Sequence, residues 1–365
     1  MRALNEGRHI RRRLEARRRG CPRSDLGRPP GVRAWPVVVT CLGVAVAPSM
    51  VAGQQVDTEL YGNFRYSANA AADGSTSWAA MANNASRLGV RGSVEGGGLT
   101  ARMDLQTGVD VDGGADGAFT QRYYFVELSG GFGAVAVGRR STTYKMAGLR
   151  LDPFYDTSTI SVAGTVPAGG LFAGASFGLS NLTNGFADAT VEYTTPQVGG
   201  LSVNAAAQVD PASDHDLSAG LVFRRAGVEF GFQHYEARGT RWAQTAGVDA
   251  AQRIHASYGN GGRWTLGGSA ERVTADAGGE NRYLYAVGTM RVVPSVTLVA
   301  AAGDVGGEGG LAPVAGTGIH AGVFLDLLPQ VRLHALYSHL EADSGPAIRN
   351  AALGLSYGFT LAGDR

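Results

Sequence analysis

Apolar and polar residues alternate one by one along most of the chain beyond about residue 57. In the stretch 86–95, Leu88 and Val90 occupy alternate positions, with Gly89 between them and Arg87 and Arg91 on either side. Successive side chains of a β-strand point to opposite faces, so this pattern predicts a strand with one apolar and one polar face. Charges on the polar face are incompatible with a packed protein core, and the apolar face must therefore meet another apolar medium. We interpret that medium as lipid.

Sixteen segments share this alternation and predict an all-β protein, a transmembrane antiparallel β-barrel of about 16 strands. Tight turns alternate with longer polar connections such as 69–84 and 111–119, which is typical of a barrel with short turns at one rim and long loops at the other. A soluble β-sandwich also contains alternating strands, but it rarely needs sixteen of them. The predicted strands lie near 58–68, 85–95, 99–110, 120–129, 133–141, 186–195, 201–209, 216–224, 227–236, 250–258, 263–273, 281–291, 295–303, 318–327, 331–341 and 348–359.

Aromatic residues gather near the ends of these segments. A membrane barrel carries girdles of aromatic side chains at both interfaces, and we expect these residues to form them. They are Tyr61, Tyr66, Tyr123, Tyr124, Tyr193, Trp264, Tyr283, Tyr285, Tyr337 and Tyr357.

One long segment, from about residue 142 to 185, lacks the strand rhythm. A structureless loop of roughly 40 residues inside a compact domain is uncommon unless the loop is functional. In lipid every backbone polar group must be paired internally, which forces the sheet to close. A closed sheet of about sixteen strands then encloses a lumen too wide for side chains to fill. We therefore predict that residues 142–185 fold into the mouth of the barrel.

The first 53 residues predict an N-terminal extension with a cleaved signal peptide. A region rich in arginine precedes the apolar run 35–46, and small residues follow at 47–53. This order of basic, apolar and small residues is that of a secretory signal. Residues 54–365 are then the mature barrel domain, which begins at about Gln54.

The mature part has a charge and composition of its own. Of the chain's 32 Lys+Arg and 31 Asp+Glu residues, 11 and three lie in the leader, which leaves 21 and 28 and a formal net charge of −7. Such a chain has no positive footprint for nucleic acid. Both cysteines, Cys21 and Cys41, lie in the leader, which excludes disulfides and thiolate chemistry from the mature part. Lys145 is the only lysine, a bias toward arginine that we attribute to genomic composition.

Six stretches carry a specific pattern in a fixed order. They read LYGNFRYS (60–67), SRLGVRGSVEGGGLTARMDLQTGV (86–109), YYFVELSGGFGAVAVGRR (123–140), VEYTTPQVGGLSV (191–203), and LHALYSHLEAD with LGLSYGF (333–343, 353–359). Together they resemble the general porins of Gram-negative outer membranes, and the resemblance spans nearly all of residues 58–359. Chains of that family usually stop at an aromatic residue, whereas here residues 360–365 extend beyond Phe359.

The resemblance implies a homotrimer of sixteen-stranded barrels, each with an inward-folded third extracellular loop as its constriction. That loop bears acidic groups and faces arginines on the barrel wall. In this chain the loop is 142–185, and its acidic residues are Asp152 and Asp156. Alternation places four of the candidate wall arginines on the lumen side, while the side of the fifth, Arg140, depends on the phase of its strand. The five wall arginines are Arg65, Arg87, Arg91, Arg102 and Arg140.

These features predict a porin of the outer membrane of a Gram-negative bacterium, with a water-filled channel for passive diffusion of small hydrophilic solutes and ions. An alternative is a substrate-specific outer-membrane channel, in which loop residues and lumen arginines bind a carboxylated or phosphorylated solute. A barrel enzyme or adhesin is a third class. We expect no enzymatic activity and no cofactor or metal. The expected partners are outer-membrane lipid and lipopolysaccharide, the permeating solutes and ions, further copies of the chain, and the barrel-assembly machinery, but no nucleic acid.

Two short motifs suggest other chemistry but lack its context. GASFG (174–178) fits G-x-S-x-G, yet a nucleophile elbow needs a strand, a turn and a helix, and this motif lies in a Gly/Ala-rich stretch. DVDGGADG (110–117) is rich in oxygen ligands, but its fifth position is glycine and no glutamate closes it as in an EF-hand. A solvated acidic loop is the simpler interpretation of 110–117, with a bound divalent cation as the alternative.

Overall fold

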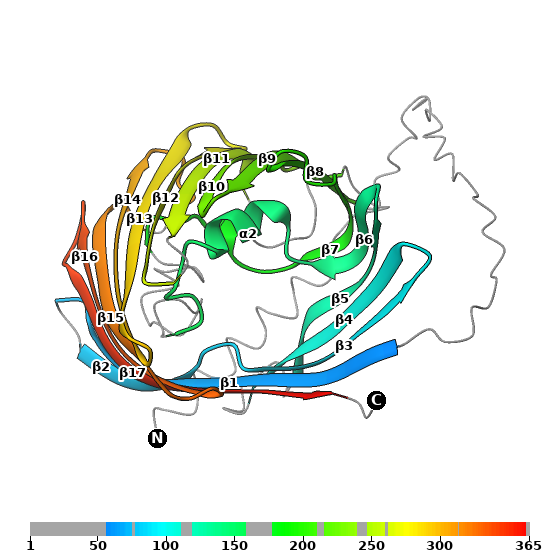
Figure 1. Ribbon diagram of the computed structural model, residues 1–365. Coiled ribbons are helices and arrows are strands. Elements are labelled where there is room, and N and C mark those ends of the chain that lie inside the picture. The colour runs from blue at the N-terminus through cyan, green and yellow to red at the C-terminus, as the bar shows by residue number, and fades with distance from the viewer. Residues whose placement is uncertain are drawn as a thin grey trace, which may run out of the picture. The chain divides into compact units, whose positions relative to one another are not determined.

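The described residues form one continuous antiparallel sheet of seventeen strands in the computed structural model of the protein (Figure 1). The leader predicted for residues 1–53 lies outside the described residues, and so does most of each of the two discounted motifs. Neither α2 (Thr143–Leu149) nor any other helix among the described residues is long and apolar enough to cross a membrane. The structure describes residues 56–74, 77–110, 119–157, 177–209, 215–238, 247–259, 262–312 and 314–362.

The strands agree with the predicted segments to within a few residues, apart from one addition, β2, and a longer first strand. Their bounds are β1 (Val56–Ala72), β2 (Ser77–Asn83), β3 (Arg87–Gly96), β4 (Leu99–Val109), β5 (Phe119–Gly130), β6 (Gly133–Arg140), β7 (Ala187–Thr194), β8 (Leu201–Gln208), β9 (Leu217–Arg225), β10 (Val228–Glu236), β11 (Val248–Gly259), β12 (Trp264–Ala275), β13 (Glu280–Val293), β14 (Val296–Gly307), β15 (Gly316–Leu328), β16 (Val331–Ala342) and β17 (Ile348–Ala362).

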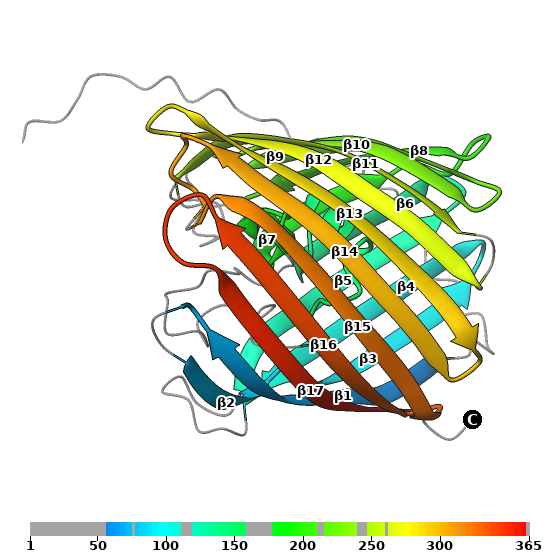
Figure 2. The same cartoon turned by 90° about the vertical axis from the view of Figure 1, so that its left-hand side faces the viewer.

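Sixteen of these described strands, β1 and β3–β17, close a barrel. The strand β1 pairs with β3 on one side and with the last strand, β17, on the other, while each of β3–β16 pairs with the strand that follows it. Closure leaves every barrel strand with two neighbours, which is what a lipid environment requires of backbone polar groups. Figure 2 shows the strands inclined side by side around the wall. The predicted closed barrel is confirmed.

The strand β2 corrects the prediction of a polar loop over 69–84. It pairs with the second half of β1, while β3 pairs with the first half. Two asparagines from the ends of this predicted loop instead donate hydrogen bonds to the same serine, Ser67, on the inner face. Asn69 Nδ2 donates to Ser67 Oγ at 2.8 Å, and Asn84 Nδ2 donates to the same oxygen at 2.9 Å.

The outer face of the barrel is apolar and the inner face is polar. On β4 the side chain of Leu105 is 44% exposed, whereas its neighbour Gln106 is 5% exposed. Large apolar side chains in the same outward phase are exposed on other strands as well, for example Val126 on β5 and Leu284 on β13. This surface has only lipid or another subunit to contact.

Of the aromatic residues predicted for the girdles, four tyrosines lie on the outer face as a girdle requires and four others do not, so the girdles themselves stay a prediction. Tyr124, Tyr193, Tyr337 and Tyr357 are exposed on the outer face. The other four occupy the opposite phase of their strands, so alternation directs their side chains inward. Tyr61 and Tyr123 line the lumen, and Tyr283 and Tyr285 are buried against the loop that follows β6.

Arginine introduced at Leu105 is expected to destabilise the barrel. A charged side chain on the lipid face costs about 2–4 kcal/mol near the bilayer midplane and less near the interfaces. Ser93→Arg is the matched control, because Ser93 faces Arg102 across the β3–β4 pair on the polar inner face. Urea unfolding in lipid vesicles measures both variants, and equal stability of the two would contradict the assignment of faces.

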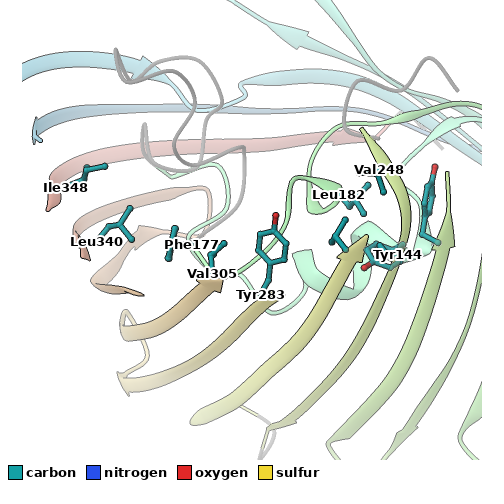
Figure 3. Packing of buried hydrophobic residues seen from close by; sticks show 11 residues of the cluster. Tyr144, Phe177, Leu182, Val248, Tyr283, Val305, Leu340 and Ile348 are labelled. Atoms are coloured by element: carbon teal, nitrogen blue, oxygen red, sulfur yellow. The ribbon is translucent and has the colours of Figure 1, made fainter. Parts of the chain in front are cut away.

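The described parts of the segment between β6 and β7 pack on the inner side of the wall. The helix α2 lies within the ring of strands in Figure 1, and the short helix η2 (Asn181–Thr183) follows further along. Tyr144 and Leu182 from this segment pack against strand residues such as Val248 and Tyr283 (Figure 3). Residues 158–176 lie outside the described residues, so a constriction formed by all of 142–185 stays a prediction.

The segment between β6 and β7 has two described arms, 142–157 and 177–185. A glycine on β14 permits the second arm to lie directly on the wall. A Cβ atom added at Gly303 would overlap the carbonyl oxygen of Phe177. Any larger residue at this position would therefore separate the two backbones.

Candidate channel constriction

Arg65 and Arg87 come together because the pairing of β1 is interrupted between β2 and β3. In this gap Ala85 adopts a left-handed backbone with a φ of 56°, and Ser86 Oγ accepts a hydrogen bond from Arg65 N at 2.9 Å. The Ser86 hydroxyl replaces the backbone carbonyl that a continuous β-ladder would have offered to Arg65 N. The interruption places both guanidinium groups at one point of the inner wall.

Asp156 is the loop residue that meets these two arginines. Its Oδ2 lies 3.3 Å from Arg65 Nη1 and 3.0 Å from Arg87 Nη1. The residue has a φ of 58°, a left-handed conformation that aspartate tolerates better than most residues. One buried carboxylate therefore bridges two cations, and the three groups together keep a formal charge of +1.

Asp152 lies in the same turn as Asp156 but is placed against another part of the wall. Its Oδ1 accepts hydrogen bonds from Phe154 N at 3.0 Å and from the hydroxyl of Tyr285 at 3.3 Å. Tyr285 belongs to β13, whereas the arginines that meet Asp156 belong to β1 and β3. The two predicted acidic residues thus have different surroundings, and Asp152 holds the turn in shape and on the wall.

The remaining predicted arginines also lie on the inner face, each next to an acidic residue of a neighbouring strand. The phase of Arg140 is settled by its guanidinium, which lies 5.2 Å from the ring centroid of Phe125 and on the same side of the sheet as Arg102. The role of Arg91, Arg102 and Arg140 at a constriction stays a prediction. The ion pairs are Arg91 Nε–Glu59 Oε2 at 2.5 Å, Arg102 Nη2–Glu127 Oε1 at 3.0 Å and Arg140 Nη2–Glu192 Oε1 at 3.5 Å.

Arg122 is a lumen residue that the sequence analysis missed. Its Nε donates to Gln106 Oε1 at 2.7 Å, and its guanidinium lies 4.9 Å from the ring centroid of Phe186. Strict alternation from Tyr124 would place Arg122 on the outer face. A register shift in the β4–β5 pair changes the phase. The pairs Leu105–Tyr124 and Thr107–Gln121 are separated by one residue on β4 but by two residues on β5, so one extra residue of β5 is accommodated there.

Lys145, on the first turn of α2, was also missed as a site residue. Thr142 caps this helix and accepts a hydrogen bond from Lys145 N at 3.1 Å. The side chain is buried, and Nζ donates to the carbonyl oxygen of Gly185 at 2.6 Å. Burial, and then the charge of Arg122, lower the pKa of Lys145 to about 7.

Of the side chains described above, Arg65, Arg87, Arg91, Arg122, Lys145 and Asp156 line a cavity of about 910 Å³, whereas Asp152, Arg102 and Arg140 are not among its lining residues. Among the residues that the structure describes, six cationic and three acidic side chains line it, together with tyrosines and amides. The cations are Arg65, Arg87, Arg91, Arg122, Lys145 and Arg332, and the acids are Asp104, Asp156 and Asp326.

A buried ion pair between β11 and β12 holds both described parts of the loop segment on the wall. Arg253 Nη2 on β11 lies 2.7 Å from Glu271 Oε2 on β12, and both side chains are fully buried. Arg253 also donates to the carbonyl oxygen of Tyr144 at 2.9 Å and to Thr183 Oγ1 at 2.6 Å. Glu271 accepts from the hydroxyl of Tyr144 at 2.7 Å and from Ser180 N at 3.1 Å. Because α2 and η2 meet at this one pair, it fixes the position of both.

The described residues include no group of three or more His, Cys, Asp or Glu side chains arranged to hold a metal ion. The acidic stretch considered as a cation site in the sequence lies almost wholly outside the described residues.

A closed barrel with a charged, water-accessible lumen defines the protein as a membrane channel. The family model described as Gram-negative porin matches residues 38–345. The chain therefore belongs to the Gram-negative porin family, and it is an outer-membrane channel for solute diffusion and not an enzyme. No curated protein sequence matches the chain.

Solved porin structures share this fold at low sequence identity. The anion-selective porin from Comamonas acidovorans is 17% identical over 84% of this chain and 100% of that chain, with a TM-score of 0.65. OmpF of Salmonella typhi, in complex with daunomycin, is 13% identical over 84% and 98%, with a TM-score of 0.63. OmpT of Vibrio cholerae, folded in vitro and in a trimer form, is 16% identical over 84% and 100%, with a TM-score of 0.60.

Proposed function

We propose that the channel is narrowest between the loop segment 142–185 and the arginines of β1, β3 and β5, and that it prefers anions there. The observation that carries this proposal is the charge of the cavity lining, six cations against three acids. The lining has a formal charge of +3 with Lys145 protonated. Glu59, the partner of Arg91, reduces that charge to +2.

Fixed charge of one sign raises the local concentration of the opposite ion. The effect is strong in a narrow lumen, because protein and lipid around it have a low dielectric constant and focus the field. The net charge of −7 over the mature sequence does not oppose this, since exposed charges more than about 10 Å away are screened at 0.1 M salt. Anions should therefore enter the constriction more readily than cations of equal size.

The reversal potential of the purified channel in a planar bilayer with a KCl gradient tests the proposal. We expect chloride to be more permeant than potassium. Arg122→Gln should lower the chloride preference, because it removes one cation of the lining. A preference for potassium in the wild-type channel would overturn the proposal.

The second candidate function, a substrate-specific channel, is favoured by the grouping of Arg65, Arg87 and Arg122 around one cavity. Guanidinium groups bind carboxylates and phosphates with two parallel hydrogen bonds each. In such a channel, one organic anion would block the chloride current in a saturable way while a neutral solute of the same size would not. Block that rises linearly with concentration for every anion would favour general diffusion.

Assembly and maturation are proposals as well. A homotrimer is supported by the exposed apolar outer face and by the trimer form of the OmpT structure. Cross-linking in mild detergent should show a three-subunit species, and a monomer alone would count against it. Cleavage of the leader after about residue 53 would give a mature chain starting near Gln54, which mass spectrometry of the membrane-inserted protein measures.

A further inference from the structure

Lys145 is chemically unlike every other cation of the cavity. The chain contains 32 Lys+Arg residues, of which Lys145 is the only lysine, and it stands at the lumen. A guanidinium keeps its charge at every physiological pH, whereas the charge of a buried ammonium depends on its surroundings. One cation of the lining is therefore able to lose its charge while the others are not.

Within the described part of the chain, the direct partners of the Lys145 ammonium are uncharged. Its Nζ donates to the Gly185 carbonyl oxygen at 2.6 Å and lies 4.2 Å from the ring centroid of Phe186 and 5.8 Å from that of Tyr155. A carbonyl and two aromatic faces attract a cation, but they replace its hydration only in part. A neutral amine can keep the hydrogen bond to Gly185.

The charged groups around Lys145 are mostly cations whose own partners are already assigned. Arg122 on β5 lies over the same ring of Phe186, as does Arg139 on β6, which is paired with Asp188 at 2.5 Å. Arg87 on β3 shares Asp156 with Arg65. The titratable or charged groups that face Lys145 are Arg87, Arg122, Tyr123, Arg139, Tyr155 and Asp156.

We propose that Lys145 is a selectivity-determining residue of this channel, and that gain or loss of its proton raises or lowers the preference for anions that the arginines of the lining also support. This inference rests on the proposed anion preference of the same site. The surroundings of Lys145 determine in which direction its pKa moves. Burial and the neighbouring arginines lower the pKa of Lys145 to about 7, so the ammonium is fully present below that pH and absent well above it.

The expected effect is a change of about two- to fivefold in the chloride-to-potassium permeability ratio. A unit charge about 4 Å from a permeating ion changes its local population by about fivefold even at the dielectric constant of water, and more distant positions reduce the factor. The ratio should be higher at about pH 5.5 than at about pH 8.5. The arginines of the lining keep their charges over this range, so the residual anion preference at high pH is theirs.

Reversal potentials of three channels over this pH range test the inference. The wild type should show the fall in permeability ratio, Lys145→Arg should keep the high ratio throughout, and Lys145→Gln should keep the low one. His334 and His320 also lie on the inner wall, where His334 Nε2 and the Thr157 carbonyl oxygen are 2.7 Å apart. Because histidines also titrate in this pH range, His320→Gln and His334→Gln serve as controls, and both should retain the pH dependence of the wild type. Should Lys145→Gln not fold, Lys145→Arg alone decides, because it must abolish the pH dependence.

The possible outcomes separate the inference from the function on which it rests. A wild-type channel that prefers anions equally at all pH values, or a pH dependence that survives in Lys145→Arg, would overturn the role of Lys145 and leave the proposed function intact. A channel without anion preference at any pH would overturn the proposed function itself.

A second measurement is independent of ion flow. Because the chain has a single lysine, the pH dependence of its acetylation by acetic anhydride, followed by mass spectrometry of the folded barrel, reports the protonation of Lys145 directly. We expect half-maximal reactivity near pH 7. A half-maximal reactivity near pH 10, as for an ordinary lysine, would contradict the inference.

Discussion

Replacing Asp156 by Asn is expected to raise the chloride-to-potassium permeability ratio by about two- to fivefold, whereas Asp152→Asn should leave it nearly unchanged. Asp156 is the carboxylate that neutralises Arg65 and Arg87, and its removal frees one cationic charge at the lumen. Two unit charges 4 Å apart interact by about 1 kcal/mol in water, which corresponds to about a fivefold change in ion population. Asp152 is hydrogen-bonded to Tyr285 and to its own turn, so its loss acts on the loop and not on the wall arginines.

Single-channel recordings in a salt gradient compare the two variants with the wild type. The double variant Arg65→Gln/Arg87→Gln provides the opposite change, because it leaves Asp156 unpaired and should shift the channel toward cations. Equal effects of Asp152→Asn and Asp156→Asn would contradict the distinction drawn between the two carboxylates. Unchanged reversal potentials in all variants would place the permeation path away from this cluster.

Arg253→Met is expected to release the loop segment from the wall. Removing one partner of a buried ion pair leaves an uncompensated charge and costs about 3–5 kcal/mol. Here the carboxylate of Glu271 can regain water if α2 and η2 leave the wall, so the cost appears as opening of the loop while the barrel stays folded. Cleavage by a lysine-specific protease reports that opening, since the only site follows the buried Lys145. The cleavage rate should rise by a factor of about 100 or more.

Arg272→Met is the matched control for this experiment. Arg272 lies on β12 next to Glu271 and pairs with Glu280 at 2.5 Å, but its side chain is 59% exposed. An exposed ion pair contributes about 0–1 kcal/mol, so the loop should remain protected from the protease. The double variant Arg253→Met/Glu271→Met should open less than Arg253→Met alone, because it leaves no buried charge. A protected loop in Arg253→Met would show that the ion pair does not hold it.

The site was only partly accessible to reasoning from the sequence. Asp156, Arg65 and Arg87 were named as candidates, and the structure places them within ion-pair distance of one another. Arg122 was missed because a register shift between β4 and β5 moves it to the inner face, and no local pattern announces that shift. Lys145 was set aside as a matter of composition, although its uniqueness was the one signal that could have identified it.

The buried pair of Arg253 and Glu271 shows the same limit. Both residues occupy inward positions on strands whose residues alternate between the two faces, and any lumen-facing charge would occupy such a position. Nothing in their own segments distinguishes a charge in water from one that is fully buried under loop residues that lie 70 or more positions away in sequence.

The sequence by itself determined the strands, the two faces of the wall and the presence of a loop without strand character. These properties follow from a period of two residues and from turn chemistry, both of which are local. The tertiary structure decided which inward side chains meet, because closure of the barrel, the register shifts and the path of the loop bring together residues from distant strands. It thereby separated Asp156 from Asp152, and it placed the single lysine of the chain among the arginines of the lumen.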